Sequence, residues 1–301
     1  MNALPIHRRP YATDTLPEMV AFCEAHNASG HPPGLINTLI GSLASGPDAI
    51  IDLWEGDRQV LVAVVLDQLQ NTDDAAECAL LGYRPAMAPQ SLWPVLCTLA
   101  EQIVAAGPRR SIGIGLGEGT AAMAPFLLAR GYRQNFTCYG MTTAKNPRLP
   151  GRIALEAPWQ WRPLDEPRVR AYYEAVRATL GTVPGTQTPA YADFAALALA
   201  ARIPPQLLYQ GDRLAGFFKV VLKGPDGTVG YINSLGRMPE FHGQGMGVRL
   251  LAEAMHQLAA LGARSFALEV VATNDAALSL YAWHGFAVTS EEPHFLWHLP
   301  H

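Results

Sequence analysis

Apolar and polar residues follow two different periods along this 301-residue chain, and the two periods alternate. Short segments rich in β-branched and aromatic residues predict strands, and segments with apolar residues three or four positions apart predict helices. The predicted strands cover residues 49–54, 59–66, 76–83, 111–116, 134–141, 206–209, 214–222, 228–238, 265–271 and 295–299. The predicted helices cover residues 16–26, 35–43, 91–106, 120–129, 167–180, 191–201, 248–258 and 275–284. This alternation indicates an α/β (α+β) protein.

The order of predicted elements occurs twice, and short sequence matches accompany the repetition. The turn Gly56-Asp57-Arg58 recurs as Gly211-Asp212-Arg213, and Leu81-Gly82 recurs as Leu235-Gly236 about 154 residues later. The same shift continues without a gap as far as Gly131 and Gly285. Tandem copies of one α/β unit explain this fixed register, and the proline-rich residues 146–158 form the predicted linker. We therefore predict two domains, 1–145 and 159–301.

Three glycines lie between the predicted strand 228–238 and the helix that follows it. The N–H groups in the first turn of a helix have no partner within the helix, and the positive end of the helix dipole lies there. Glycines also let a phosphate approach the backbone closely, so this junction is a candidate pyrophosphate site. It consists of Gly243, Gln244, Gly245, Gly247 and Val248. The Walker and dinucleotide-binding glycine loops have other spacings, and a glycine-rich turn that only starts a helix is the alternative.

A second group of polar residues follows the predicted strand 265–271. Glu269 lies on that strand, Asn274 follows its end, and Tyr281 comes about two helical turns later. Ala277 and Leu280 share one face of the helix, which Tyr281 borders. Tyr281 is therefore either a functional group or a core residue with its hydroxyl at the rim. Glu269 is likewise either a catalytic base or a carboxylate hydrogen-bonded to a neighbouring strand.

The first half of the repeat lacks these groups. At the positions of Gly243, Gly245, Gly247, Asn274 and Tyr281 it has Pro89, Ser91, Trp93, Thr120 and Leu127. A tryptophan would block a phosphate, and a proline lacks the N–H donor. The N-terminal copy is thus predicted to keep the fold without a cofactor site.

Composition narrows the class of partner. Apolar residues make up 49% of the chain and charged residues 16%, which suits packed globular domains. The net charge of −4 and the absence of a Lys/Arg block disfavour nucleic acid as a partner. No apolar run predicts a membrane span. Cys23, Cys78, Cys97 and Cys138 are spaced like reduced thiols of a cytoplasmic protein, and no metal site is predicted.

Together these motifs resemble those of the GNAT acetyltransferase superfamily. Its first hallmark, R/Q-x-x-G-x-G/A, corresponds to residues 242–247, with His242 in place of Arg or Gln. Its second hallmark, N-x-x-A-x-x-L-Y-x-x-x-G-F, is matched by Asn274, Ala277, Leu280, Tyr281, Gly285 and Phe286. The resemblance implies two tandem folds, each with a mixed, mostly antiparallel sheet flanked by helices. A tandem chain with a degenerate N-terminal copy is similar in layout to mycothiol synthase, whereas residues 268–286 look more like the ribosomal-protein alanine acetyltransferases.

The resemblance also implies an activity, namely direct transfer of an acetyl group from acetyl-CoA to an amine. A backbone N–H on the strand around Gly236, Arg237 and Met238 would donate a hydrogen bond to the thioester oxygen, and Asn274 would hold the cofactor arm or order the loop. Tyr281 would act as general acid and Glu269 as general base. The Arg237 side chain could contact substrate or CoA, or point to solvent.

Several alternatives stay open at this level. The acceptor is expected to be a small-molecule amine bound where two domains meet, because ligand sites often form there. O-acetylation, transfer of a longer acyl group, and a non-catalytic acyl-CoA sensor are the rival functions. A scaffold without a ligand is disfavoured, since it has no need of three glycines at one helix start. The chain is expected to act as a monomer or a homodimer.

Overall fold

The computed structural model describes residues 5–26, 49–66, 75–84, 89–186, 188–224 and 226–300. The chain forms two compact units. Unit 1 comprises Met1–Leu69, Asp74–Thr137 and Glu292–His301, and unit 2 comprises Gln70–Asp73 and Cys138–Glu291. The predicted helix 35–43 lies outside the described residues. No helix in the described ranges is long and apolar enough to cross a membrane.

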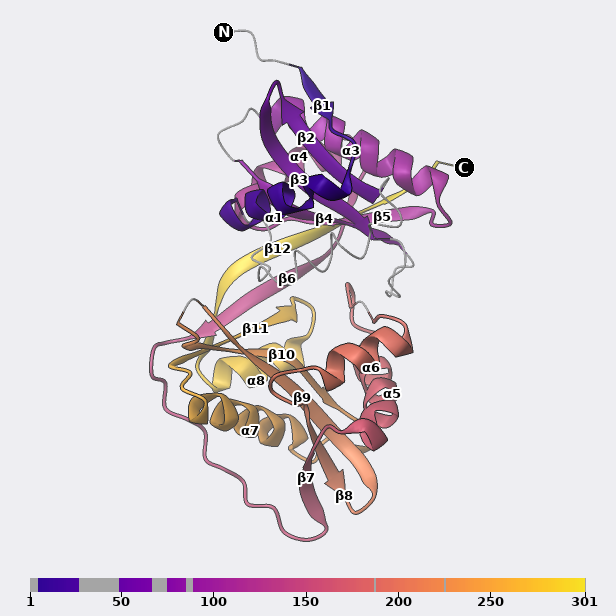
Figure 1. Ribbon diagram of the computed structural model, residues 1–301. Helices are drawn as coiled ribbons and strands as arrows, with labels where there is room; N and C mark the ends of the chain where they lie inside the picture. Colours follow the sequence, from indigo (N-terminus) through magenta and orange to yellow (C-terminus); the bar gives the residue numbers. More distant parts are fainter. Residues whose placement is uncertain are drawn as a thin grey trace. The chain divides into compact units, whose positions relative to one another are not determined.

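Unit 1 contains a mixed sheet with helices packed against it (Figure 1). Its elements are β1 (Ile6–Arg8), a 3-10 turn (Thr13–Thr15), α1 (Leu16–Ala25), β2 (Ile50–Glu55), β3 (Arg58–Leu66), β4 (Ala76–Tyr83), α3 (Pro89–Ala106), β5 (Ser111–Gly115), a 3-10 turn (Glu118–Met123) and α4 (Ala124–Ala129). Strands β1 to β4 pair antiparallel in sequence order, and β4 pairs parallel with β5.

Unit 2 repeats this plan (Figure 1). Its elements are β7 (Trp159–Pro163), a 3-10 turn (Glu166–Arg168), α5 (Val169–Thr179), α6 (Tyr191–Leu199), β8 (Gln206–Gln210), β9 (Arg213–Lys223), β10 (Val229–Arg237), a 3-10 turn (Pro239–Phe241), α7 (Met246–Ala260), β11 (Ser265–Val271) and α8 (Asp275–Trp283). Strands β7 to β10 pair antiparallel, and β10 pairs parallel with β11. Each unit thus has one parallel pair in a mostly antiparallel sheet.

Two long strands contribute residues to both units. In β6 (Arg133–Thr143), Cys138 to Thr142 pair with β11, and in β12 (Phe286–His298), His294 to His298 pair with β5. The compact units therefore divide the chain differently from the predicted domains 1–145 and 159–301. In each case the last strand of one sequence half completes a ladder with a strand of the other half.

Most predicted elements are confirmed within a few residues, and three strands are not. The last predicted strand, 295–299, was wrong in its start, because β12 begins at Phe286. Its first part is rich in Thr, Ser and Glu and has no apolar alternation, so backbone pairing rather than side-chain burial holds it in the sheet. The short strands β1 and β7 were missed for a similar reason, since neither is fully buried on one face.

Two apolar layers cover the two faces of the sheet in unit 2. Ile232, Leu268 and Val270 belong to the core that includes the buried residues of α7 and Tyr281 of α8. On the opposite face, Phe217 packs in the core formed by α5 and α6. The helices on the two faces are visible in Figure 1. Side chains that alternate along β9, β10 and β11 therefore point toward one helix layer or the other.

The positions of unit 1 that align with the predicted site are filled by core side chains. Trp93 is 2% exposed and its ring lies 4.9 Å from that of Tyr83. Leu127, at the position of Tyr281, is completely buried. Both residues belong to the main apolar core of unit 1. An apolar core thus occupies the place where unit 2 has its candidate site.

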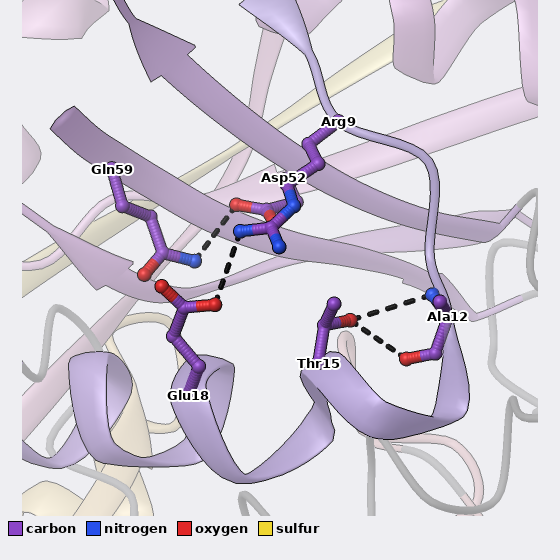
Figure 2. Close-up of polar contacts among 6 residues, drawn as sticks. All are labelled: Arg9, Ala12, Thr15, Glu18, Asp52 and Gln59. Atoms are coloured by element: carbon purple, nitrogen blue, oxygen red, sulfur yellow. Dashed lines mark hydrogen bonds and ion pairs between the residues drawn. The ribbon is translucent and has the colours of Figure 1, made fainter. Parts of the chain in front are cut away.

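A buried carboxylate in unit 1 gives a test of stability. Asp52 is 2% exposed, and Gln59 Nε2 donates a hydrogen bond to its Oδ1 at 2.8 Å, beside the pair formed by Arg9 and Glu18 at 3.0 Å (Figure 2). Burial raises the pKa of Asp52 above its usual value, and the hydrogen bond from Gln59 and the charge of Arg9 offset this only in part. Folding therefore disfavours the charged form of this carboxyl.

We expect Asp52→Asn to stabilise unit 1 at neutral pH. Because the folded pKa is raised, the contribution of Asp52 to stability is full below its unfolded pKa of about 3.9 and is lost as pH rises through the folded pKa. The asparagine keeps an oxygen acceptor for Gln59 and has no charge to bury. Thermal unfolding measured from pH 3.5 to 8 should show an advantage for the variant that grows with pH. A variant less stable than wild type at pH 7 would contradict this account.

Candidate active site

Strands β10 and β11 separate part-way along their length in unit 2. Their parallel pairing runs from Val229 and Ser265 to Ile232 and Leu268 and then stops, although both strands continue. At the same level β10 has a register shift relative to β9, between Ile232 and Ser234. A bulge bends its strand and increases the local twist. It therefore accounts for the gap that opens between the two strands.

The separation leaves backbone N–H groups of β10 facing the gap. The N–H of Met238 donates to the carbonyl of Ala215 at 2.9 Å, which places Met238 in a hydrogen-bonded pair with β9. Because antiparallel pairs alternate, Gly236 also points its N–H toward β9, whereas Leu235 and Arg237 point theirs the other way. Of the three residues among which the sequence placed the donor, only Arg237 directs its N–H toward the gap. This geometry adds Leu235, which the sequence did not indicate.

A cleft of about 390 Å³ lies at this gap. Residues of the α5 C-terminus, the end of β10, the start of α7 and α8 line it: Ala178, Thr179, Leu180, Thr182, Val183, Leu235, Gly236, Arg237, Pro239, His242, Gly247, Asn274, Ala276, Ala277, Leu280 and Tyr281. None of these residues is acidic, and Arg237 and His242 supply positive or potentially positive charge. The lining thus suits an anionic ligand with an apolar arm.

The glycines at the start of α7 have the geometry expected of an anion site. Gly245 precedes the helix with φ 68° and ψ 15°, a left-handed conformation that favours glycine. The first hydrogen bond is donated by the N–H of Arg249 to the carbonyl of Gly245 at 3.2 Å. The N–H groups of Met246, Gly247 and Val248 therefore have no partner in the helix. A Cβ added at Gly243 or Gly245 would meet nothing within 4 Å, so both glycines border open space.

Gly236 and Gly247 are glycines for another reason, namely close packing. A Cβ at Gly236 would lie 2.4 Å from Phe217 and 2.7 Å from the hydroxyl of Thr179. A Cβ at Gly247 would lie 3.1 Å from Leu280. Gly236 thus lets α5 approach the sheet, and Gly247 lets α7 approach α8. Both contacts shape the walls of the cleft.

Tyr281 lies on α8 with its side chain largely buried. The residue is 9% exposed, lines the cleft and packs against Phe286 with ring centroids 6.0 Å apart. Burial raises the pKa of Tyr281 to about 12. The hydroxyl is therefore protonated at neutral pH and is able to donate a proton to a leaving group in the cleft.

Asn274 caps helix α8. Its side-chain oxygen accepts a hydrogen bond from the N–H of Ala277 at 3.2 Å, which is the usual role of asparagine before a helix. The residue also lines the cleft, as do Ala277 and Leu280, which the helical spacing placed on one face. His284 does not line it; its Nδ1 lies 2.7 Å from the carbonyl of Leu280. The cap holds α8 in the position that brings Tyr281 to the cleft.

Glu269 lies on β11 on the face opposite to Tyr281. It is exposed, and its carboxylate accepts a hydrogen bond of 2.7 Å from the hydroxyl of Tyr231. Both interpretations of Glu269 from the sequence thus remain. Its bond to Tyr231 fits a carboxylate hydrogen-bonded to a neighbouring strand, and its exposure to solvent beside the gap fits a catalytic base. Among the described residues, no three His, Cys, Asp or Glu side chains gather as a metal site would need.

The structure brings together only part of the predicted site. Gly236, Arg237, Gly247, Asn274 and Tyr281 all line the cleft. Six other predicted residues do not line it: Met238, Gly243, Gln244, Gly245, Val248 and Glu269. The side chain of Gln244 instead donates a hydrogen bond to the carbonyl of Glu240 at 3.3 Å. The wall formed by residues 178–183 was missed, because it comes from a helix end some 50 residues earlier in the chain, where the sequence has no motif.

Comparison with known proteins identifies the fold. Residues 168–286 match the sequence model of the Acetyltransferase (GNAT) family. A GCN5-related N-acetyltransferase from Sphaerobacter thermophilus is 17% identical, with 98% of this chain and 96% of that chain aligned and a TM-score of 0.68. A tandem GNAT protein from the clavulanic acid biosynthesis pathway is 14% identical, with 97% and 98% aligned and a TM-score of 0.70. The sequence has no match among curated proteins.

Residues 168–286 are therefore similar in sequence to GNAT acetyltransferase domains, and the chain has the fold of tandem GNAT proteins. The predicted fold class, a mixed, mostly antiparallel sheet arrangement flanked by helices, is confirmed, although the hydrogen-bonded strands of the described residues form one 12-stranded sheet and not two separate ones. GNAT acetyltransferases use acetyl-CoA as the acetyl donor. The structure fits that donor, because the unpartnered N–H groups of Met246 to Val248 suit a pyrophosphate and the cleft has room for an apolar arm.

Proposed function

We propose that this chain is an acetyl-CoA-dependent N-acetyltransferase that acts on the amine of a small molecule by direct transfer. The observation that carries the proposal is the cleft at the gap between β10 and β11. Gly247 at the start of α7, Tyr281 of α8, and Leu235 and Arg237 with their outward N–H groups on β10 all line this cleft. These are the groups that acyl transfer from a thioester requires.

Each group has a distinct role in this proposal. The N–H groups at the start of α7 bind the pyrophosphate of acetyl-CoA, together with the positive charge of Arg237. The outward N–H of Leu235 donates a hydrogen bond to the thioester oxygen, where negative charge develops, and the outward N–H of Arg237, about 7 Å further along the strand, is left for the arm of acetyl-CoA. Tyr281 protonates the departing thiolate. Asn274 fixes α8 and thereby the position of Tyr281.

The acceptor amine approaches from the other face of the sheet, where Glu269 lies. Its ammonium form must lose a proton before attack, and Glu269 accepts that proton directly or through water. Residues of both helix layers line the cleft, Thr179 on α5 and Tyr281 on α8, which supports a passage between the two faces. Positioning of both reactants supplies much of the remaining acceleration.

We expect Glu269→Gln to lower kcat/KM for an amine by about tenfold at neutral pH, and less as pH rises. The effect is moderate because Glu269 is exposed, so solvent can take over part of the proton transfer. At higher pH more of the amine is already neutral and the base matters less. Steady-state assays from pH 6.5 to 9.5 check this. Glu174→Gln, at an exposed position on α5, is the matched control. A loss that does not change with pH would assign Glu269 a structural role.

The proposed activity is tested by incubating the protein with acetyl-CoA and a panel of small amines. The free thiol of CoA is measured, and acetylated products are identified by mass. Amine-dependent thiol release with an N-acetyl product supports the proposal. Release only with alcohols would favour O-acetylation, and acetyl-CoA binding without any transfer would favour a sensor.

Unit 1 is proposed not to bind acetyl-CoA itself, because Trp93 and Leu127 fill the corresponding positions with core side chains. We further propose a cytoplasmic location, with the protein acting as a monomer or homodimer and without nucleic acid. The four cysteines support a reducing location, since all are free thiols and three are buried.

A further inference from the structure

A group of polar side chains occupies the sheet face beside α5 in unit 2. Helix α5 covers this face as far as Phe217 on β9 and Gly236 on β10. Beyond them, on the same face, are Lys219 and Lys223 of β9, Tyr231 of β10 and Glu269 of β11. The alternation of buried and less buried residues along β9 confirms this orientation, because Phe218 and Val220 point into the opposite core.

Lys219 is the unusual member of the group. It is half-buried, and its ammonium has no hydrogen-bond or ion-pair partner among the described residues. Burial lowers its pKa. An unpaired charge that is partly removed from water costs free energy, which a ligand of opposite charge would recover. Such a residue beside a reaction site is a candidate for ligand recognition.

The other three members contact one another. The hydroxyl of Tyr231 donates to Glu269 at 2.7 Å, and the ammonium of Lys223 lies 3.4 Å from the centroid of the Tyr231 ring. These contacts hold Glu269 against Tyr231, next to the point at which β10 and β11 separate. Lys219 stands apart from this chain of contacts.

Strand register places Lys219 and Glu269 at the same level of the sheet. Ile232 pairs with Val220 on one side and with Leu268 on the other. One residue further along, Lys219 and Glu269 therefore flank β10 at its bulge, with Cα atoms roughly 10 Å apart, or two strand spacings. The outward N–H of Leu235 follows the bulge by two residues, about 7 Å along the strand. A positive and a negative side chain thus lie on the two sides of β10, near the proposed acyl-transfer point.

We propose that the acceptor is a small amine that also carries a carboxylate, as an α-amino acid does, and that Lys219 binds this carboxylate while Glu269 faces the amine. This inference rests on the proposed N-acetyltransferase function and specifies its substrate class. A zwitterion of this kind is complementary to the two charges, because its carboxylate is opposite in sign to Lys219 and its ammonium is opposite in sign to Glu269. Lys219 is thus a specificity-determining residue that takes no part in proton transfer.

The test compares each of the common L-amino acids with its carboxamide, which keeps the amine and removes the negative charge. Wild type should show a kcat/KM for its preferred amino acid at least about tenfold above that for the amide, the usual value of one charge-assisted contact. Lys219→Met should bring this ratio close to one, because KM for the amino acid rises while kcat/KM for the amide changes little. Lys219→Arg should restore it. Acetyl-CoA affinity should be the same in all variants.

Lys223→Met is the matched control, because it removes an ammonium from the same strand and face, and it should keep the ratio. The inference is overturned if wild type acetylates amides as well as acids, or if Lys223→Met and not Lys219→Met abolishes the ratio. In either case the N-acetyltransferase function stands. If wild type binds acetyl-CoA and acetylates no amine in the panel, the proposed function and this inference fail together.

Discussion

Gly245→Trp should weaken acetyl-CoA binding by at least about 100-fold, on the order of 3 kcal/mol. The tryptophan copies the residue type that the first repeat has nearby, at Trp93. A Cβ at Gly245 would enter open space, so the ring would project over the N–H groups of Met246 to Val248 and cover them. A pyrophosphate would then lose both its donors and its place near the helix dipole.

The left-handed backbone at Gly245 requires a careful control. Any side chain there has a strain of about 1–2 kcal/mol, which could lower stability without bearing on the ligand. Gly211, at the turn between β8 and β9, has a φ of 61°, compared with 68° at Gly245. As at Gly245, an added Cβ at Gly211 would have no atom within 4 Å. Gly211→Trp should therefore show a similar loss of thermal stability.

Calorimetric titration of acetyl-CoA into wild type and both variants separates binding from stability. We expect Gly211→Trp to bind like wild type and Gly245→Trp to show no measurable heat. If Gly245→Trp binds normally, the cofactor lies elsewhere, and the asymmetry between the two repeats has another meaning. If the two variants lose binding equally, strain rather than steric blocking is the cause.

Tyr281→Phe should lower kcat by about 100-fold or more, the usual contribution of a positioned general acid. Phenylalanine keeps the contact with Phe286 and removes only the hydroxyl. Acetyl-CoA affinity should not change, because the hydroxyl donates its proton after the cofactor is bound. Single-turnover assays would place the loss in the chemical step.

The raised pKa of Tyr281, about 12, predicts the shape of the pH profile. Because burial favours the neutral hydroxyl, the acid stays protonated as pH rises through the range in which amines lose their protons. The wild-type rate should therefore increase with pH and should not fall through loss of Tyr281's proton until the pH approaches 12.

Tyr209→Phe is the matched control for Tyr281→Phe. Tyr209 is 7% exposed, burial raises its pKa as well, and it lies on β8 outside the cleft. Its variant should retain wild-type kcat. Equal losses in the two variants would indicate a general effect of removing a buried hydroxyl and would contradict the role of Tyr281.

The sequence by itself determined the fold class and the repeat, and it predicted those candidate site residues that leave a local signal. Gly245 needs a left-handed backbone at a helix start, and Asn274 caps the next helix, so both leave signals within a few neighbouring residues. Strand β11 was predicted to the residue because its burial alternates along the strand. The loss of the site in the first copy follows from comparing residue types such as Gly247 and Trp93.

Only the tertiary structure decided which side chains lie close together and which backbone N–H groups already have a hydrogen-bond partner. The N–H of Met238 donates a hydrogen bond to the carbonyl of Ala215, whereas the N–H of Leu235 points toward the gap. The register between β9 and β10 determines which N–H groups face the gap. Strand β6 pairs with β11, and β12 pairs with β5. Both pairings join segments that are far apart in the chain, so no local sequence pattern predicts them. Lys219 and Glu269 lie 50 residues apart in sequence, and strand pairing alone brings them to the two sides of one bulge.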